Sequence, residues 1–163
     1  MSILKKRAIF SPSGREENRL RDWESRTDAA LAWLRRSIES TGGQGSAHSW
    51  SPLFGWAKAY PETTGYLVET LLDYADLKQD ESLRELASHC VGWLRSIQMP
   101  DGAFPGLLAG HTQPSVFNTA MIVFGLSAGL SLPEREKTEL ALRRAVSWLL
   151  AQLEPDFSWR KHA

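Results

Sequence analysis

Aromatic and acidic side chains gather between residues 50 and 66, and their types suggest a binding or catalytic site. Five of them are candidates: Trp50, Trp56, Tyr60, Glu62 and Tyr66. Indole rings stack on flat sugar faces, although aromatic residues in loops also fill gaps between helices. Glu62 opens a predicted helix beside the two tyrosines, where a carboxylate can act as an acid or base or can only stabilise the helix end. We assign Glu62 and Tyr60 as candidate catalytic residues and the other three as candidate substrate-binding residues.

A second set of candidates lies further along the chain, in loops and at a helix start. Asp101 recurs as Asp156, so it could bind a ligand or only form hydrogen bonds within a turn. Phe104 could stack on a sugar ring, and Asn118 could bind a ligand or cap a helix. Trp159 completes the set. We expect all of them except Asp156 to contribute to substrate binding.

Several classes of function lack their sequence signatures in this chain. The 19 basic and 19 acidic side chains give zero net charge, so we expect no attraction to nucleic acid or to an anionic membrane. His48, His111 and His162 are scattered over loops without the spacing of metal ligands. The single cysteine, Cys90, is expected to be a small buried thiol rather than a nucleophile. No glycine-rich phosphate loop occurs, and we expect neither a metal nor a cofactor.

Hydrophobic periodicity predicts five helices. Apolar residues recur at steps of three and four over residues 28–40, 62–77, 82–98, 115–130 and 134–153. The first helix could run continuously from about residue 15 or restart at a cap formed by Thr27 and Asp28. We find no segment that alternates with period two, so we expect no sheet of consequence.

One pattern occurs twice at an offset of 55 residues. The segment from Trp93 to Phe104 aligns without a gap with the segment from Trp148 to Trp159, and the two share Trp-Leu and Pro-Asp pairs. A shifted third copy begins at Trp33. A period of this length indicates a repeat architecture, here with repeats at 28–78, 82–131 and 134–163. The first tryptophan of each copy should therefore be buried and equivalently placed.

The order of the elements predicts part of an α/α toroid. Each repeat has an amphipathic helix, a long loop and a largely apolar helix, so the long loops 41–60 and 99–114 should lie at one end, beside Glu62 and Asn118. The helix at 115–130 is apolar nearly all round and should be buried on most sides. The expected fold class is all-α, with about two and a half α/α hairpins in a domain over residues 15–163, after an N-terminal arm of residues 1–14.

Four segments carry a resemblance to known families. Residues 98–106 resemble the Asp-Gly-aromatic repeats of prenyltransferase and squalene cyclase toroids, a pattern shared with six-hairpin glycosidases, polysaccharide lyases and sugar epimerases. Residues 55–66, 116–120 and 158–163 are similar to bacterial α/α-toroid proteins from polysaccharide gene clusters. The resemblance covers about residues 28–163. It implies sugar chemistry, and a truncated toroid, because closure in this class takes roughly five to seven hairpins.

The chain also departs from these families. Squalene cyclases carry an acidic motif where this chain has Ser115-Val116-Phe117-Asn118-Thr119-Ala120, so no strong acid is placed to protonate an alkene. Protein prenyltransferases hold zinc through Asp, Cys and His, and no such triple occurs here in the right spacing. Phe157 stands where the second repeat has the turn residue Gly102.

The expected function is a carbohydrate-active domain that binds or processes an oligosaccharide or polysaccharide, in the hydrolase, lyase or epimerase class. The alternatives are a non-catalytic binding or scaffold fragment of a toroid, or a terpenoid cyclase or prenyltransferase relative without the acid motif. No signal peptide or membrane span is visible, so we expect a cytoplasmic protein. Incomplete closure predicts a homodimer or docking onto missing hairpins.

Overall fold

The computed structural model describes residues 14–108 and 110–162, which are mostly helical. The elements are α1 (Gly14–Glu39), β1 (Trp50–Ser51), β2 (Gly55–Trp56), α2 (Pro61–Lys78), α3 (Glu81–Ser96), α4 (Val116–Ala128), a 3-10 turn η1 (Gly129–Ser131) and α5 (Arg135–Ala151). The chain divides into two compact units, one up to Trp33 and one from Leu34 onward. The second unit contains every element from the end of α1 to α5 and all the candidate site residues.

The predicted helices are confirmed, with ends that differ by a few residues. The helix at 28–40 is the second half of α1, which runs continuously from Gly14 without restarting at Thr27 and Asp28. The all-α class is confirmed at this coarse level, with only two strands of two residues each among the described residues. The predicted N-terminal arm lies, apart from Gly14, outside the described residues.

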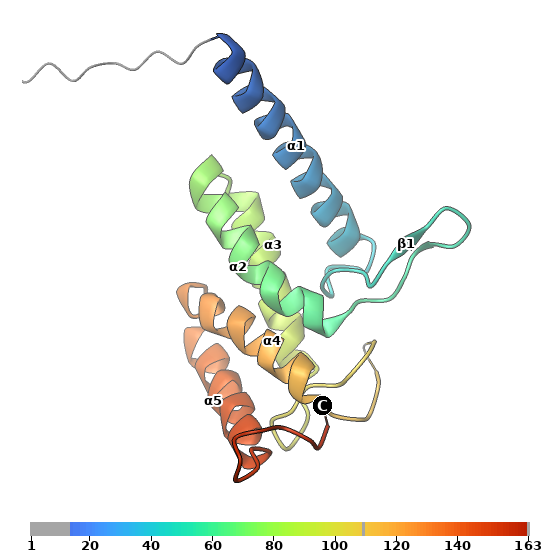
Figure 1. The fold of residues 1–163 in the computed structure, drawn as a ribbon, viewed down its shortest axis with the longest axis vertical. Coiled ribbons are helices and arrows are strands. Elements are labelled where there is room, and N and C mark those ends of the chain that lie inside the picture. The colour runs from blue at the N-terminus through green and yellow to red at the C-terminus, as the bar shows by residue number, and fades with distance from the viewer. Residues whose placement is uncertain (1–13, 109, 163) are drawn as a thin grey trace, which may run out of the picture. The chain divides into compact units, whose positions relative to one another are not determined.

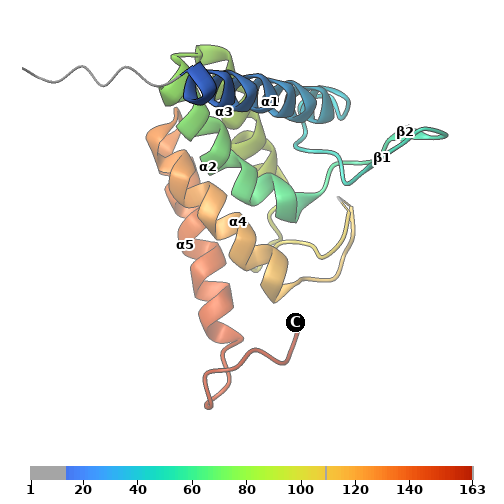
Figure 2. The same ribbon diagram turned by 45° about the horizontal axis from the view of Figure 1, so that its top comes forward.

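Helices α2 and α4 lie side by side and point the same way, as both views show (Figures 1 and 2). Two glycines make this approach close. A Cβ atom on Gly125 would lie 2.2 Å from the carbonyl oxygen of Gly65, and one on Gly65 would lie 2.7 Å from the Cα atom of Ile122. The two backbones are therefore in direct contact at this point. Fully buried side chains complete the core around α2, α3 and α4: Val68, Leu71, Leu83, Leu94, Ile122 and Leu126.

The long loops 41–60 and 99–114 lie at the end where α2 and α4 begin, and the short turns after α2 and α4 lie at the other end (Figures 1 and 2). This is the arrangement that the sequence predicts.

The same kind of hydrogen bond anchors both long loops to the helices that follow them. The Thr64 hydroxyl accepts from the backbone N–H of Ser46 at 3.0 Å, and the Thr119 hydroxyl accepts from that of Phe104 at 3.0 Å. Thr64 and Thr119 are again 55 residues apart.

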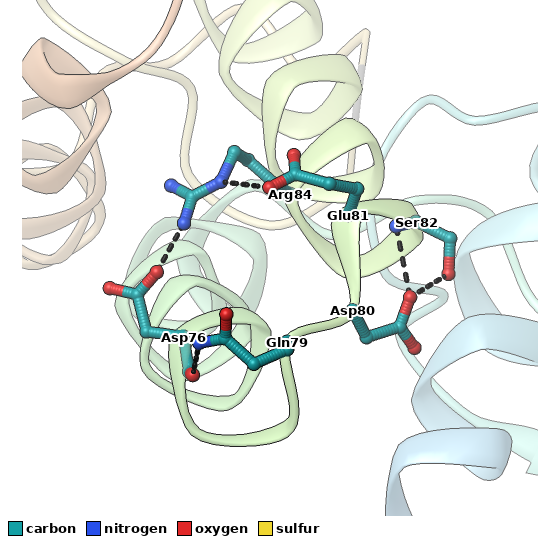
Figure 3. Close-up of polar contacts among 6 residues, drawn as sticks. All are labelled: Asp76, Gln79, Asp80, Glu81, Ser82 and Arg84. Carbon is teal, nitrogen blue, oxygen red and sulfur yellow. Dashed lines mark hydrogen bonds and ion pairs between the residues drawn. The ribbon is translucent and has the colours of Figure 1, made fainter.

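A short turn joins α2 to α3 and is closed by side chains at both helix ends (Figure 3). Gln79 takes the left-handed conformation that ends α2, and its side-chain amide donates to the Asp76 carbonyl at 2.7 Å. The Asp80 carboxylate caps α3 by accepting from the backbone N–H of Ser82 at 2.9 Å. Arg84 pairs with Asp76 across the turn. These local bonds fix the antiparallel packing of α2 on α3.

The two repeated turns have the same backbone hydrogen bonds. In each turn the first residue bonds to the residues three and four further along, and an aspartate accepts from the amide two residues on. The pairs are Met99–Gly102, Met99–Ala103 and Asp101–Ala103 in the first turn, and Glu154–Phe157, Glu154–Ser158 and Asp156–Ser158 in the second. Residues 55 positions apart therefore form turns with the same hydrogen bonds.

The substitution of Phe157 for the turn glycine leaves the turn intact but strains it. Phe157 has a φ of 62° and an exposed ring, whereas its counterpart Gly102 has a φ of 101°. A residue with a Cβ atom costs roughly 1–2 kcal/mol in the left-handed region. Part of this cost is offset because glycine loses more entropy on folding.

We expect Phe157→Gly to stabilise the protein by about 1 kcal/mol, because it removes this backbone strain without removing a buried side chain. Urea unfolding followed by circular dichroism measures the change. Gly102→Ala is the matched control of opposite sign, since its Cβ atom would lie 2.6 Å from the Arg144 carbonyl oxygen. Equal or lower stability of Phe157→Gly would show that the turn is not strained.

The repeat tryptophans are not equally buried, which corrects the prediction. Trp148 is buried and donates its indole N–H to the Asp101 carboxylate at 3.1 Å, so the turn of the preceding repeat covers it. Trp93 is partly buried against Gly45 in the preceding loop. Trp33 is 43% exposed. The physical reason is that no repeat turn precedes Trp33 within the described residues.

Helix α4 is buried on most sides, as predicted, but it leaves one stripe exposed. Phe117 and Phe124 are 54% and 55% exposed, although Ile122 and Leu126 are fully buried. Leu140 and Leu150 on α5 are also exposed. Helices α2, α3 and α5 pack against α4, and Phe117 and Phe124 lie on the one stripe that no described element of the second unit covers.

Candidate functional site

The hairpin that precedes α2 presents large polar and aromatic side chains in an alternating pattern. Trp50 lies opposite Trp56, and Ala47 lies opposite Ala59 in the same register. His48 therefore lies opposite Lys58, and the His48 N–H donates to the Lys58 carbonyl at 2.9 Å. Side chains alternate between the two faces of an extended strand. The sequence Trp56-Ala57-Lys58-Ala59-Tyr60 places its three large residues on one face and its alanines on the other.

Sequence reasoning missed this alternation and, with it, two residues of the site. The statement that no segment alternates with period two is wrong for residues 56–60, because the regular strand is too short to be noticed beside the helical periodicities. His48 and Lys58 were not among the candidates. His48 packs edge-on against Tyr60, with ring centroids 4.9 Å apart and an interplanar angle of 87°. This contact confirms that His48 and Tyr60 share a face.

Tyr60, Glu62 and Tyr66 form a cluster at the start of α2. Tyr60 is the residue that precedes the helix, Glu62 lies in its first turn, and Tyr66 follows one turn later on the same side. Burial, a hydrogen bond with Glu62 and the charge of Glu62 raise the pKa of Tyr60 above its ordinary value. Burial and the Glu62 charge also raise the pKa of Tyr66. Both phenols therefore stay protonated at neutral pH and can donate hydrogen bonds beside a carboxylate.

A pocket of about 500 Å³ opens beside the hairpin. One wall is the loop after α1, with Ser40, Thr41 and Gln44, and the other is the strand from Trp56 to Ala59. Volumes of about 300–1,000 Å³ are typical of small-ligand sites. Of the sequence candidates, Trp56 alone lines this pocket. The site thus has two neighbouring parts, the tyrosine–glutamate cluster and the Trp56 pocket.

Three of the sequence candidates have structural roles in this fold. Phe104 is completely buried, so its ring has no free face for stacking, and we remove it from the candidate site. Asp101 uses one carboxylate oxygen for the Ala103 N–H and the other for the Trp148 indole. Asn118 is buried and donates to the Pro105 carbonyl at 2.9 Å. The turn reading of Asp101 is therefore the one that the geometry supports.

Asn118 does not cap α4 either. That role belongs to Ser115, whose hydroxyl accepts from the Asn118 N–H at 3.2 Å. Trp159 lies beyond α5, with an indole N–H that donates to the Leu149 carbonyl at 2.9 Å and a ring that is partly exposed. The structure thus groups Trp50, Trp56, Tyr60, Glu62 and Tyr66 around one hairpin and the helix that follows it.

The remaining reactive groups do not add to the site. Cys90 is buried as predicted, and burial raises the pKa of its thiol to about 12, which leaves it without nucleophilic thiolate at neutral pH. Across residues 14–108 and 110–162, no group of three His, Cys, Asp or Glu side chains is arranged to hold a metal ion. None of the helices over the same residues combines the length and apolar character needed to cross a membrane.

Comparison with known proteins gives no family assignment. No protein-family model matches the chain, and no curated protein and no solved structure is similar to it. The features that bear on function are therefore the geometry of the hairpin, the cluster and the pocket.

Proposed function

We propose that this chain binds an oligosaccharide or polysaccharide at the end of the second compact unit where the long loops lie. The observation that carries the proposal is the grouping of Trp50, Trp56, Tyr60, Glu62 and Tyr66 on one hairpin and the first turns of α2. Aromatic faces bind the apolar side of a sugar ring, and phenol and carboxylate groups bind its hydroxyls. This combination on an open surface suits an extended polar ligand better than a small apolar one.

We also propose that the helices belong to an α/α toroid. The parallel packing of α2 and α4, the loops gathered at one end and the repeated turns at 99–103 and 154–158 support this arrangement. In such a toroid, α2 and α4 would be inner helices whose starts face a shared opening. The positive ends of their helix dipoles would add a preference for polar or acidic ligands.

Catalysis in the hydrolase, lyase or epimerase class is a second candidate, favoured by the Tyr60–Glu62 pair. Tyr60 precedes α2 and Glu62 lies in its first turn, so the pair offers a phenol and a carboxylate, two groups that can act as acid and base. Glycoside hydrolysis ordinarily takes two carboxyl groups on opposite sides of the bond. Asp101 does not supply the second one, since both of its oxygens are bonded within the fold. We therefore place binding before catalysis.

A non-catalytic scaffold role is supported by the exposed apolar side chains of α4 and α5. Phe117, Phe124, Leu140 and Leu150 would be covered by a second copy or by further hairpins. A terpenoid cyclase role has less support, because the position of the cyclase acid motif holds the buried Asn118, whose amide bonds to Pro105.

Isothermal titration calorimetry with a panel of neutral and acidic oligosaccharides tests the proposed binding. We expect Trp56→Ala to weaken binding at least tenfold. The substitution removes the aromatic face that contacts the sugar ring, and such a contact contributes roughly 1–3 kcal/mol to the free energy of binding. Glu62→Gln should weaken it by about threefold or more through the loss of charged hydrogen bonds to sugar hydroxyls.

Two matched variants serve as controls for these measurements. Glu69→Gln changes an exposed carboxylate further along α2, and Trp23→Ala removes an exposed indole from α1. Both should bind like the wild type. If no sugar binds the folded wild-type chain, and the chain self-associates at micromolar concentration in sedimentation velocity, the scaffold role replaces the carbohydrate site.

A further inference from the structure

The described residues that line the pocket beside the hairpin include one basic residue and no acidic one. Its lining residues are Ser40, Thr41, Gln44, Trp56, Ala57, Lys58 and Ala59. Lys58 forms no ion pair or hydrogen bond through its ammonium group with any residue in the described part of the chain. The charge of the pocket is therefore positive at neutral pH, which favours an anionic ligand.

Two hydrogen-bond donors of the pocket are available to such a ligand. They are the Lys58 ammonium and the side-chain amide of Gln44, which is exposed and has no side-chain bond within residues 14–108 and 110–162. An ammonium and an amide N–H together match the two oxygens of a carboxylate. The Lys58 carbonyl accepts from the His48 N–H, which fixes the Lys58 backbone at the strand that forms the pocket wall.

The two hydroxyl groups of the pocket can accept hydrogen bonds from a ligand, because their own protons are already donated within the protein. The Ser40 hydroxyl donates to the Ser37 carbonyl at 2.7 Å. The Thr41 hydroxyl lies 2.7 Å from the Gly45 carbonyl and 2.8 Å from the Ile38 carbonyl. Each proton is committed to the backbone, so each oxygen presents only lone pairs to the pocket. Such oxygens bind the hydroxyl groups of a sugar, which can donate.

Trp56 adds the third element, since it also lines the pocket and alternation along the strand places it on the same face as Lys58. We propose that this pocket binds the uronic-acid unit of an acidic saccharide, with its carboxylate on Lys58 and Gln44, its hydroxyls on Ser40 and Thr41, and its ring against Trp56. The proposal rests on the proposed carbohydrate function and names its substrate class. A simple inorganic anion would use Lys58 and Gln44 but would gain nothing from Trp56 or from the acceptor oxygens.

The test compares an α-1,4-linked galacturonate trimer with the galactose trimer of the same linkage, by calorimetry on the full chain. We expect the wild type to bind the galacturonate trimer about tenfold more tightly at low salt, with the preference falling as salt is added. Lys58→Gln should abolish this preference, because it weakens binding of the galacturonate trimer much more than binding of the galactose trimer. Lys161→Gln, an exposed lysine outside the pocket, should keep the preference.

Two further measurements separate the possible outcomes. The Gln44 side-chain amide signals in a ¹H–¹⁵N spectrum should shift with the galacturonate trimer and much less with the galactose trimer. Equal affinity for both trimers would overturn the acidic-sugar inference and leave the carbohydrate function standing, whereas failure of both to bind would overturn both. If inorganic phosphate binds as tightly as the galacturonate trimer and Trp56→Ala changes neither, the pocket is an anion site and the sugar inference is wrong.

Discussion

Alanine in place of Gly65 or Gly125 is expected to destabilise the protein by about 2–3 kcal/mol. A Cβ atom on Gly125 would lie 2.2 Å from the Gly65 carbonyl oxygen, and one on Gly65 would lie 2.7 Å from the Met121 carbonyl oxygen and the Ile122 Cα atom. These are backbone atoms, so relief requires α2 and α4 to move apart. Overpacking of this kind costs about 1–3 kcal/mol and sometimes more.

The intrinsic helix propensities change the stability in the opposite direction, so a loss of stability in these variants is explained by the close helix contact and not by propensity. Alanine is favoured over glycine by about 1 kcal/mol in a helix interior. Gly92→Ala in α3 is the matched control, because its Cβ atom would meet nothing closer than the end of the Arg95 side chain at 3.8 Å. That variant should be stabilised by about 0.5–1 kcal/mol. Guanidinium unfolding measures all three variants, and stabilisation of Gly65→Ala would show that the two helices do not approach as described.

Valine in place of Thr64 or Thr119 is expected to cost about 2–3 kcal/mol, although valine matches the shape of threonine. Each buried hydroxyl accepts from an incoming loop and donates to the carbonyl four residues earlier, Tyr60 for Thr64 and Ser115 for Thr119, at 2.7 Å. The substitution removes two hydrogen bonds and leaves a loop N–H without its partner. An unsatisfied buried donor costs about 1–3 kcal/mol.

Loss of this anchor should also be visible as local opening. In Thr64→Val, the Ser46 amide should exchange with solvent faster than in the wild type by more than the global stability change explains. The Phe104 amide should respond in the same way to Thr119→Val. Thr64→Ser keeps the hydroxyl and should lose less than half as much stability. Equal losses for the serine and valine variants would assign the effect to the methyl group instead.

Much of the helical architecture could be predicted from the sequence because its signals are local. Apolar residues at steps of three and four located α2 to α5 within a few residues. The two turns that lie 55 residues apart in the sequence also form the same hydrogen bonds in the structure. The turn role of Asp101 was one of two readings, and its bond to Trp148 selects it.

Other features were decided only by the tertiary structure, because they depend on residues far apart in the chain. A helical pattern does not show that Gly65 will meet Gly125, that Phe104 will be buried while Phe117 is exposed, or how completely each repeat tryptophan is covered.

The candidate site divides in the same way between local and tertiary information. The aromatic and acidic residues from Trp50 to Tyr66 could be recognised by type from the sequence. The shared face of His48 and Tyr60 depends on the register of a short hairpin, and the pocket at Lys58 depends on a loop more than ten residues away. Residue types and short-range periodicity can be read from the local sequence. Burial, cross-strand register and pocket walls arise from packing between distant segments, so these features are determined only in the folded chain.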